Sequence, residues 1–389
     1  MNFRLLISGS CFLLLLAAIS LSKVFPRANA CHASATSGFS RQETVAIPYR
    51  FAAVIVDLVF SPKDRLLAAT MITPDWYGPG IIKVWQYDEA TDSISLLLHE
   101  FETRSHHLAL SPDGQWLVGA EYGGKPTIES IGIIEVWNLE TGKQQYRLNG
   151  YERDFGGVKT IGITPDSEFL ITGSNFLEHY DEIRGHNLQI WDLQTGTLEA
   201  SLGGHPDAVT ALAISPNGQL LASAGRTKVN GEKTNIHLWD LETRTVIRTL
   251  ETDTEEVSAL LFTPDGKSLI SGSKDHKIRL WEVQTGQLTQ VLVGHHQPVD
   301  QLAVSDDGKQ LISRSRHESI RMWDLQTGKQ DQLITEGIGM TFAFSSETEQ
   351  LITTDYRYSE QDNYISTWEN DQEHPFQLWA CCHLNLLCR

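Results

Sequence analysis

Two titratable residues, Asp57 and His107, occupy matching places in this sequence, because each lies four residues before a Ser-Pro pair. A carboxylate and an imidazole can act as a general acid and base, or can bind a metal ion. The matching positions farther along the chain are Thr160, Ala211, Ala259, Gln301 and Thr341. One acid and one imidazole are few for a metal cage or a catalytic pair, so this column supports only an alternative prediction: an enzyme, or a binder of a small ligand or metal.

Other motifs that could carry chemistry are weak. Asp265-Gly266-Lys267-Ser268 resembles the end of a phosphate-binding loop, but Leu261 stands where that loop needs its first glycine. No G-x-G-x-x-G, H-E-x-x-H or G-x-S-x-G motif occurs. The pairs His106-His107 and His295-His296 are either ordinary loop histidines or metal ligands. The sequence therefore predicts no catalysis and no cofactor.

A second group of residues is suited to binding a protein. Aromatic and arginine side chains, which are enriched at interface hot spots, gather in segments that read as loops. We expect the aromatic residues to be anchors and the basic residues to be charged contacts, although the aromatics could instead pack against their own loops. The predicted contact residues are Trp76, Tyr77, Tyr122, Phe176, Tyr180, Arg226, Lys228, Tyr356, Arg357 and Tyr358.

A repeated turn indicates the elements that hold these residues. It reads Ser111-Pro112-Asp113-Gly114 in one copy and recurs, with variation, seven times between residues 55 and 370. Proline presets φ at the second position, Ser or Thr caps the first, and glycine permits the positive φ that reverses the chain. Each copy therefore predicts a hairpin between two strands.

A tryptophan recurs in phase with the turn. Each one ends a short β-branched run and precedes a polar turn, and the seven are Trp85, Trp137, Trp191, Trp239, Trp281, Trp323 and Trp368. Their spacings are 52, 54, 48, 42, 42 and 45 residues. A WD40 blade of four strands takes roughly 40–45 residues, so the pattern is typical of seven four-stranded units.

The chain thus resembles the WD40 repeat family over about four fifths of its length. The resemblance implies an all-β fold, a closed seven-bladed β-propeller in which one outer strand of the last blade comes from the opposite terminus. Residues 44–51 are well placed to supply that strand, and residues 375–380 compete for the position. The resemblance also implies that Trp281 and its counterparts are structural.

The sequence departs from the family pattern in its polar residues. The Gly-His pair occurs only at Gly204-His205 and Gly294-His295, and the Asp expected six residues before the tryptophan occurs only as Asp275. His317 and Lys233 occupy two of the equivalent places. No blade has the complete His, Ser, Asp and Trp set, so we expect apolar packing to hold the blades together.

The blades differ in length. From the second residue of each turn to the tryptophan they take 23, 25, 26, 23, 17, 17 and 22 residues, and we expect the excess to lie between the second and third strands. In the family that loop and the loop between blades share one face. The prediction is a long-loop face on blades 1–4 and 7 that binds a partner protein.

The N-terminus has the features of a secretory signal peptide. Arg4 precedes an apolar stretch from Leu5 to Leu21, and Ala28-Asn29-Ala30 is an A-x-A cleavage site before Cys31. We expect a protein exported to the periplasm or the extracellular space. An uncleaved membrane anchor and a lipid on Cys31 are the alternatives, and either would be the protein's only link to a membrane.

Charge and cysteine content complete the prediction. Beyond residue 30 the chain has 28 basic and 49 acidic residues, which disfavours a nucleic-acid partner. Cys31, Cys381, Cys382 and Cys388 lie outside the blades, and a bridge from Cys31 to the C-terminal group would join the two ends of the ring. The expected organisation is a signal peptide (1–30), a linker (31–43), the propeller (44–380) and a Cys-rich tail (381–389).

Overall fold

A computed structural model of the chain describes residues 40–47, 54–61, 65–72, 80–88, 93–121, 132–151, 157–174, 187–205, 208–227, 233–315, 318–335, 341–345, 350–357 and 362–369. The chain divides into residues 1–35 and 36–389, and every described residue belongs to the second part. These residues form β-strands throughout, and none of them forms a helix long and apolar enough to cross a membrane.

The strands pair into seven antiparallel four-stranded sheets, which we call blades 1 to 7. Six blades consist of strands that are consecutive in the chain. Blade 1 contains β2 (Val54–Ser61), β3 (Leu66–Ile72), β4 (Gly80–Asp88) and β5 (Ser93–Thr103). Blade 2 contains β6 (His107–Leu110), β7 (Trp116–Ala120), β8 (Ile133–Asn138) and β9 (Lys143–Asn149). Blade 3 contains β10 (Val158–Ile163), β11 (Phe169–Ser174), β12 (Leu188–Asp192) and β13 (Leu198–Leu202).

The remaining blades follow the same order, except the last. Blade 4 contains β14 (Val209–Ile214), β15 (Leu220–Gly225), β16 (Asn235–Asp240) and β17 (Thr245–Glu251). Blade 5 contains β18 (Val257–Phe262), β19 (Ser268–Ser273), β20 (Lys277–Glu282) and β21 (Leu288–Val293). Blade 6 contains β22 (Val299–Val304), β23 (Gln310–Ser315), β24 (Ser319–Asp324) and β25 (Lys329–Ile334). Blade 7 combines β26 (Phe342–Ser345), β27 (Gln350–Arg357) and β28 (Asp362–Glu369) with β1 (Ser40–Ile47).

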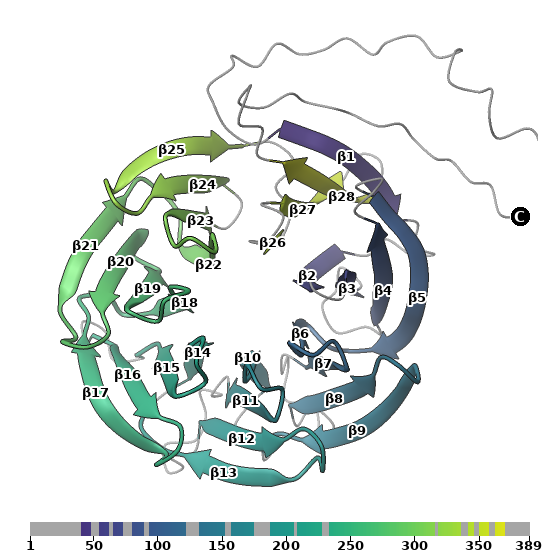
Figure 1. Cartoon of the computed structure of the whole chain (residues 1–389), viewed down its shortest axis with the longest axis horizontal. Helices are drawn as coiled ribbons and strands as arrows, with labels where there is room; N and C mark the ends of the chain where they lie inside the picture. The colour runs from purple at the N-terminus through teal and green to yellow at the C-terminus, as the bar shows by residue number, and fades with distance from the viewer. Residues whose placement is uncertain are drawn as a thin grey trace, which may run out of the picture. The chain divides into compact units, whose positions relative to one another are not determined.

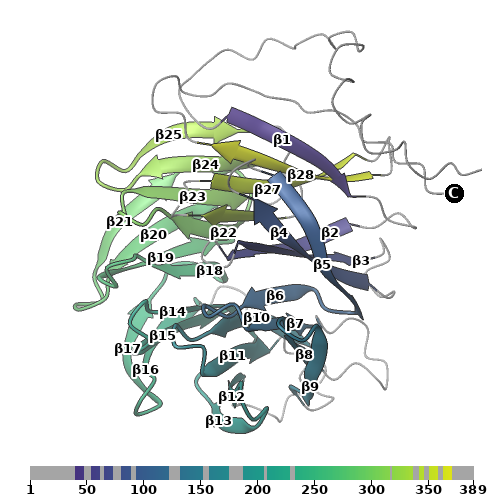
Figure 2. The same ribbon diagram turned by 45° about the vertical axis from the view of Figure 1, so that its right-hand side comes forward.

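The blades form a closed ring. The first strand of each blade is innermost, and each innermost strand contacts those of the two adjacent blades, including β26 against β2 (Figure 1). The ring closes through antiparallel pairing of β1 with β28, in which Thr44 lies opposite Ser366, and the turned view shows β1 beside β28 (Figure 2). The prediction of an all-β WD40-type propeller closed by an N-terminal strand is therefore confirmed. The closing strand begins at Ser40, inside the segment expected to be a linker, and the competing segment 375–380 lies outside the described residues.

The predicted turns have the expected geometry. In blade 2 the Gly114 amide donates to the Ser111 carbonyl at 2.9 Å, and Gly114 has a φ of +72°. The Ser111 hydroxyl accepts a hydrogen bond from the Trp116 amide at 2.8 Å, which fixes the first residue of the second strand. Blade 3 makes the same turn with Ser167 in the glycine position, at a φ of +62°.

The apolar core is divided into seven clusters, and each cluster lies between two neighbouring blades. The repeated tryptophans are part of these clusters: Trp191 of blade 3 packs with Val136 of blade 2, and Trp239 of blade 4 packs with Ile171 of blade 3. A glycine on the innermost strand of blade 3 makes room for this packing. A Cβ on Gly162 would lie 2.7 Å from Leu212 Cδ1 of the next blade.

Polar groups also hold the blades, contrary to the expectation of apolar packing alone. In blade 4 the Trp239 Nε1 donates to Ser223 Oγ at 2.7 Å, and His205 Nε2 lies 2.8 Å from the same oxygen. His295, Ser313 and Trp323 repeat the arrangement in blade 6. The expectation was wrong because three of the four residues form this buried network without the Asp.

Two blades vary this network. In blade 3 the Tyr151 hydroxyl lies 3.0 Å from Thr172 Oγ1, where other blades use His and Ser. In blade 6 a carboxylate comes from Glu318, which accepts a hydrogen bond from Ser315 Oγ at 2.6 Å and lies 3.6 Å from Arg321. Because Glu318 is one residue closer to the tryptophan than the expected Asp, the spacing of the family motif did not reveal it.

The first prediction concerns this network. Ser223→Ala leaves the Trp239 and His205 nitrogens without their shared partner, so we expect a loss of about 1–3 kcal/mol in the free energy of unfolding. Ser271→Ala in blade 5 should cost less, because Ser271 Oγ accepts from Trp281 and contacts no histidine. Urea unfolding of both variants checks this order, with the exposed Ser201→Ala as the control. Equal midpoints for Ser223→Ala and Ser201→Ala would contradict the role of the network.

Candidate functional site

The long connections lie at one end of the propeller. Between the second and third strands, blades 1 to 4 have residues 73–79, 121–132, 175–187 and 226–234, whereas blades 5 and 6 have only 274–276 and 316–318. These segments all leave the ends of second strands, which pair with the starts of innermost strands, as Ser174 does with Val158. Four neighbouring blades therefore carry long connections at the end of the ring where the innermost strands begin.

Blade 7 differs from the expectation of a fifth long loop. Its second and third strands stay paired as far as Arg357 opposite Asp362, so only residues 358–361 connect them. The extra residues lengthen the hairpin instead of the loop. Tyr356 and Arg357, predicted as loop residues, therefore belong to β27.

Most of the predicted contact residues lie outside the described residues: Trp76, Tyr77, Tyr122, Phe176, Tyr180, Lys228 and Tyr358. The cysteines of the proposed bridge also lie outside them. Of the predicted side chains the structure describes Arg226, which follows β15 and lies at the mouth of the central funnel. The contact role of the whole set stays a prediction.

The funnel mouth is a cavity of about 570 Å³ at the end with the long connections. Five of its lining residues come from irregularities in the innermost strands. The pairing of each of these strands with its neighbour shifts by one residue near its start, and the extra residue turns into the funnel, as a β-bulge does. The five residues are Val56, Lys159, Thr210, Ser258 and Asp300.

The ends of the second strands supply further charges to the same cavity. Arg226 forms an isolated backbone bridge with Glu256 across blades 4 and 5. The Lys274 Nζ lies 3.5 Å from the Glu256 carboxylate, and the Arg314 guanidinium, only 4% exposed, lies 3.5 Å from Asp300. All five residues line the cavity, which brings basic and acidic side chains from blades 4, 5 and 6 together.

Several funnel side chains join one innermost strand to the next. Thr210 and Ser258 donate hydrogen bonds to the Val257 and Val299 carbonyls of the following blades. Gln301 Nε2 donates to the Phe342 carbonyl. Polar residues that face the funnel therefore also hold its wall together.

Asp57 performs the same joining role. Its carboxylate accepts the Leu108 amide of blade 2 at 2.8 Å and the Leu58 amide at 2.9 Å. Burial raises the pKa of the Asp57 carboxyl to about 7, opposed by these two amides and by Arg314. The carboxylate that the sequence offered for catalysis is thus held by backbone donors.

His107, the second titratable residue predicted for the funnel, also lines the cavity, as does Lys159 of the next blade. Burial, followed by the charge of Lys159, lowers the pKa of His107 to about 3. The imidazole is therefore neutral at physiological pH and adds no positive charge to the funnel.

The histidine pairs have structural contacts. His295 belongs to the blade 6 network, and His296 Nδ1 lies 2.8 Å from Glu318 Oε1. Within the ranges that the structure describes, no group of three or more His, Cys, Asp and Glu side chains is placed to hold a metal ion.

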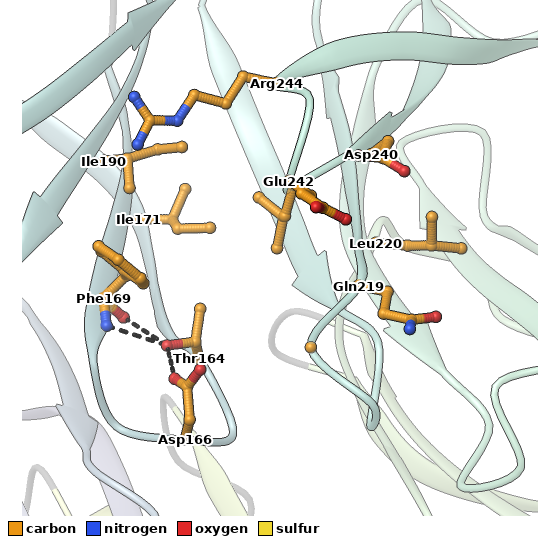
Figure 3. Close-up of a pocket in the computed structure, with 12 residues that line it drawn as sticks. Thr164, Asp166, Phe169, Ile171, Ile190, Gln219, Leu220, Asp240, Glu242 and Arg244 are labelled. Carbon is orange, nitrogen blue, oxygen red and sulfur yellow. Dashed lines mark hydrogen bonds between the residues drawn. The ribbon is translucent and has the colours of Figure 1, made fainter.

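A second cavity, of about 390 Å³, lies between blades 3 and 4 at the opposite, turn-bearing end. Phe169, Ile171 and Ile190 lie on one side, where the Arg244 side chain extends toward Ile190, and Gln219 and Leu220 lie on the other (Figure 3). A hydrogen bond from the Phe169 amide to Thr164 Oγ1, at 3.0 Å, holds the turn at its edge (Figure 3). The Arg244 guanidinium donates to the Glu199 carbonyl at 3.1 Å, so its charge is directed to blade 3.

The sequence analysis found Asp57, His107, Thr160, Gln301 and Thr341 of the funnel lining and named Arg226 as a partner contact, but it missed Lys159, Lys274 and Arg314. The prediction considered one position in each innermost strand, whereas the bulge also turns the residue before that position into the funnel. A recognisable signal was present: in four blades a valine is followed by a polar residue, as in Val158-Lys159 and Val299-Asp300.

Comparison with known proteins supports the repeat assignment. Residues 196–240, 244–282 and 286–324 match the family described as WD40, "WD domain, G-beta repeat". The matched residues run from β13 of blade 3 to β24 of blade 6. Together with the ring of four-stranded sheets, they support a β-propeller of the WD40-repeat type.

Curated proteins match shorter parts of the chain. Autophagy-related protein 16 of Arabidopsis thaliana is 29% identical over 97 residues, which are 25% of this chain and 16% of that protein. Coronin-7 of Rattus norvegicus is 35% identical over 129 residues, which cover 27% of this chain and 14% of that protein. WD repeat-containing protein SL1-17 of Schistosoma mansoni is 30% identical over 128 residues, which cover 24% of this chain and 41% of that protein. The chain thus spans less than half the length of each of these relatives.

The second prediction concerns pH. Because the pKa of Asp57 is about 7 in the folded protein and 3.8 in an ordinary aspartate, the folded chain binds the extra proton between those values. Its contribution to the free energy of unfolding is therefore present at low pH and is lost as the pH rises through about 7. Asp57→Asn cannot titrate, so the stability of the wild type relative to this variant should fall between about pH 5 and pH 8. Urea unfolding across that range measures the difference, and a constant difference would contradict the assignment.

Proposed function

We propose that this protein is a non-catalytic platform for protein–protein interaction that acts outside the cytoplasm. WD40-repeat proteins are generally scaffolds without catalysis, and their domains usually bind proteins. The observation that carries the proposal is the grouping of four long connections, from neighbouring blades, at one end of the ring. Loops at one end of a rigid scaffold are where binding residues concentrate.

The contact residues that we propose on this end combine aromatic anchors with basic residues. Trp76, Tyr77, Tyr122, Phe176 and Tyr180 belong to the long connections of blades 1 to 3. Tyr356, Arg357 and Tyr358 belong to the extended hairpin of blade 7, and Arg226 and Lys228 to the connection of blade 4. Large aromatic residues bury much area at a low entropic cost, which suits them to anchor a partner.

The third prediction tests the proposed binding end. A variant carrying Trp76→Ala, Tyr180→Ala and Tyr358→Ala should lose a partner that cross-links to the wild type in the native envelope. The matched control carries Leu198→Ala, Leu288→Ala and Leu333→Ala, which remove three exposed apolar side chains from outer strands. Quantitative mass spectrometry of the captured proteins measures both, after thermal melting shows that both variants fold. Loss of the partner with the control but not with the loop variant would overturn the proposed end.

The fourth prediction tests export. The apolar stretch and the A-x-A site at residues 28–30 predict that the mature chain begins at Cys31. Intact-mass analysis of C-terminally tagged protein from its own host should show the loss of residues 1–30 in the exported fraction. Ala28→Leu together with Ala30→Leu should block the cleavage, since the cleavage site requires small residues. Full-length wild-type chain confined to the cytoplasm would overturn this part of the proposal.

A further inference from the structure

The cavity between blades 3 and 4 lies where the ring departs from its own repeat. In blades 1 to 6 one residue of the outermost strand pairs with the residue just before the repeated tryptophan, and we call it the covering residue. In blade order the covering residues are His99, Tyr146, Ala200, Arg248, Gln290 and Gln332. Five of these six have a ring or a long polar side chain, whereas that of blade 3 is an alanine.

The long covering residues bond to the turn between the third and fourth strands of the following blade. His99 Nε2 lies 2.7 Å from the Leu139 carbonyl of blade 2. The Tyr146 hydroxyl donates to the Gln194 carbonyl of blade 3. Arg248 donates to a turn carbonyl of blade 5 at 2.7 Å. Each of these side chains therefore spans the junction between its own blade and the next.

The turn accommodates the covering side chain by having a glycine directly after its threonine. A Cβ on Gly196 would lie 2.7 Å from Tyr146 Cδ1. In blade 4 the equivalent residue is Arg244, with a φ of +57°, in the left-handed region that favours glycine. An arginine fits here because the Ala200 side chain is too short to reach the turn. The glycines of the other turns are Gly142, Gly286 and Gly328.

Arg244 does not fill the space left by the missing cover. Its guanidinium donates to the Glu199 carbonyl at 3.1 Å, and its side chain extends toward Ile190 (Figure 3). A cavity of about 390 Å³ remains, and its lining includes the buried Ile171 and Ile190. A hollow of about 440 Å³ lies at the matching place between blades 1 and 2, but there the covering residue, His99, is part of the lining. The cavity between blades 3 and 4 thus lacks a side chain that the protein supplies at other junctions.

Carboxylates surround this apolar cavity. Asp166 of blade 3 and Asp240 and Glu242 of blade 4 line it, and Arg244 is the one basic residue among the described lining residues. Arg244 also lies 3.8 Å from the Glu199 carboxylate. Three carboxylates against one guanidinium leave two negative charges in excess, which favours a positively charged partner. Because the carboxylates come from both blades, a chain that crosses the junction passes them on either side of the cavity.

The junction between blades 2 and 3 shows which side chain suits such a place. There the Tyr146 ring lies over the turn and its hydroxyl donates to the Gln194 carbonyl. The equivalent carbonyl of blade 4 belongs to Glu242, and Ala200 has no donor to offer it. Tyrosine combines an apolar ring, which matches the isoleucine lining, with a polar tip that needs an acceptor.

We propose that the cavity between blades 3 and 4 is a docking site for a partner polypeptide that inserts a tyrosine side chain next to a lysine or arginine. The ring takes the place that Tyr146 takes between blades 2 and 3, and its hydroxyl donates to the Glu242 carbonyl. The basic neighbour pairs with the carboxylates of Asp166 and Glu242. This site lies at the opposite end of the ring from the long connections, so it does not depend on the binding end proposed above.

The test uses a variant in which the protein fills the cavity itself. Ala200→Tyr together with Arg244→Gly gives this junction the residue pair of blades 2 and 3. A phage-displayed library of random heptapeptides is selected on the folded full-length wild type and depleted on the filled variant. We expect the enriched sequences to share a tyrosine next to a lysine or arginine. Fluorescence polarisation should show that the filled variant binds the most enriched peptide about tenfold or more weakly, because its own tyrosine occupies the site.

Three further variants separate the site from other effects. Arg244→Gly alone leaves the cavity open and should keep the affinity for the peptide. Glu242→Gln should weaken binding by about two- to fivefold at low ionic strength, and less at high salt, because it removes one exposed charge. The variant with Trp76→Ala, Tyr180→Ala and Tyr358→Ala should bind the peptide normally. Failure of the partner capture with intact peptide binding would count against the platform and leave this docking site standing.

Several outcomes would overturn the proposal. No enrichment over the filled variant overturns it, as does an enriched set without the paired aromatic and basic residues. Equally tight binding of tyramine would assign the cavity to a small aromatic amine. Self-association of the wild type in sedimentation experiments, absent from the filled variant, would assign it to a second copy of this chain. Thermal melting establishes that each variant is folded, and Ala200→Gln with Arg244→Gly, the pair found at blades 5 and 6, replaces the filled variant if that one does not fold.

Discussion

Closure of the ring is the constraint on which the rest of this structure depends. Each apolar cluster lies between two blades, so no blade can bury its faces by itself. The ring is completed where β1 pairs with β28 and where β26 meets β2. An open ring would expose an apolar face on each of its two end blades, whereas in the closed ring each of these faces packs against a neighbouring blade. The pairing of a strand near residue 40 with one near residue 369 thus holds the first and last parts of the fold together.

Closure also explains the polar contacts near the funnel. The innermost strands converge there, and their backbone groups face neighbouring blades instead of a pairing strand. Side chains such as Asp57, Thr210 and Ser258 satisfy amides and carbonyls of the next blade. Buried backbone groups need such partners, because an unsatisfied one costs about 1–3 kcal/mol. A propeller of this kind therefore requires polar residues on its inner wall even where no ligand binds.

The fold was predictable from the sequence because its determinants are local and repeated. Turn residues and tryptophans recur in phase, and each recurrence specifies a hairpin or a buried anchor such as Trp191. The funnel was only partly predictable, because strict alternation along a strand assigns one face to each residue and does not anticipate a bulge. Lys159 was therefore missed, although the column that contains Asp57 was found. Glu318 was also missed, because it is one residue closer to the tryptophan than the Asp of the family motif. Its carboxylate comes close to His296 only in the folded blade.

Comparison of the blades with one another separates packing from chemistry at the funnel. The residue before each of four bulges is a buried valine: Val158, Val209, Val257 and Val299. The bulge residues that follow are lysine, threonine, serine and aspartate. Equivalent backbone geometry thus accepts four different side chains, so packing does not dictate their identity. The threonine and serine donate to the next blade, which accounts for them structurally. The aspartate, Asp300, lies 3.5 Å from Arg314 of the next strand in the same blade, so equivalent bulge positions serve the funnel wall with chemically different side chains.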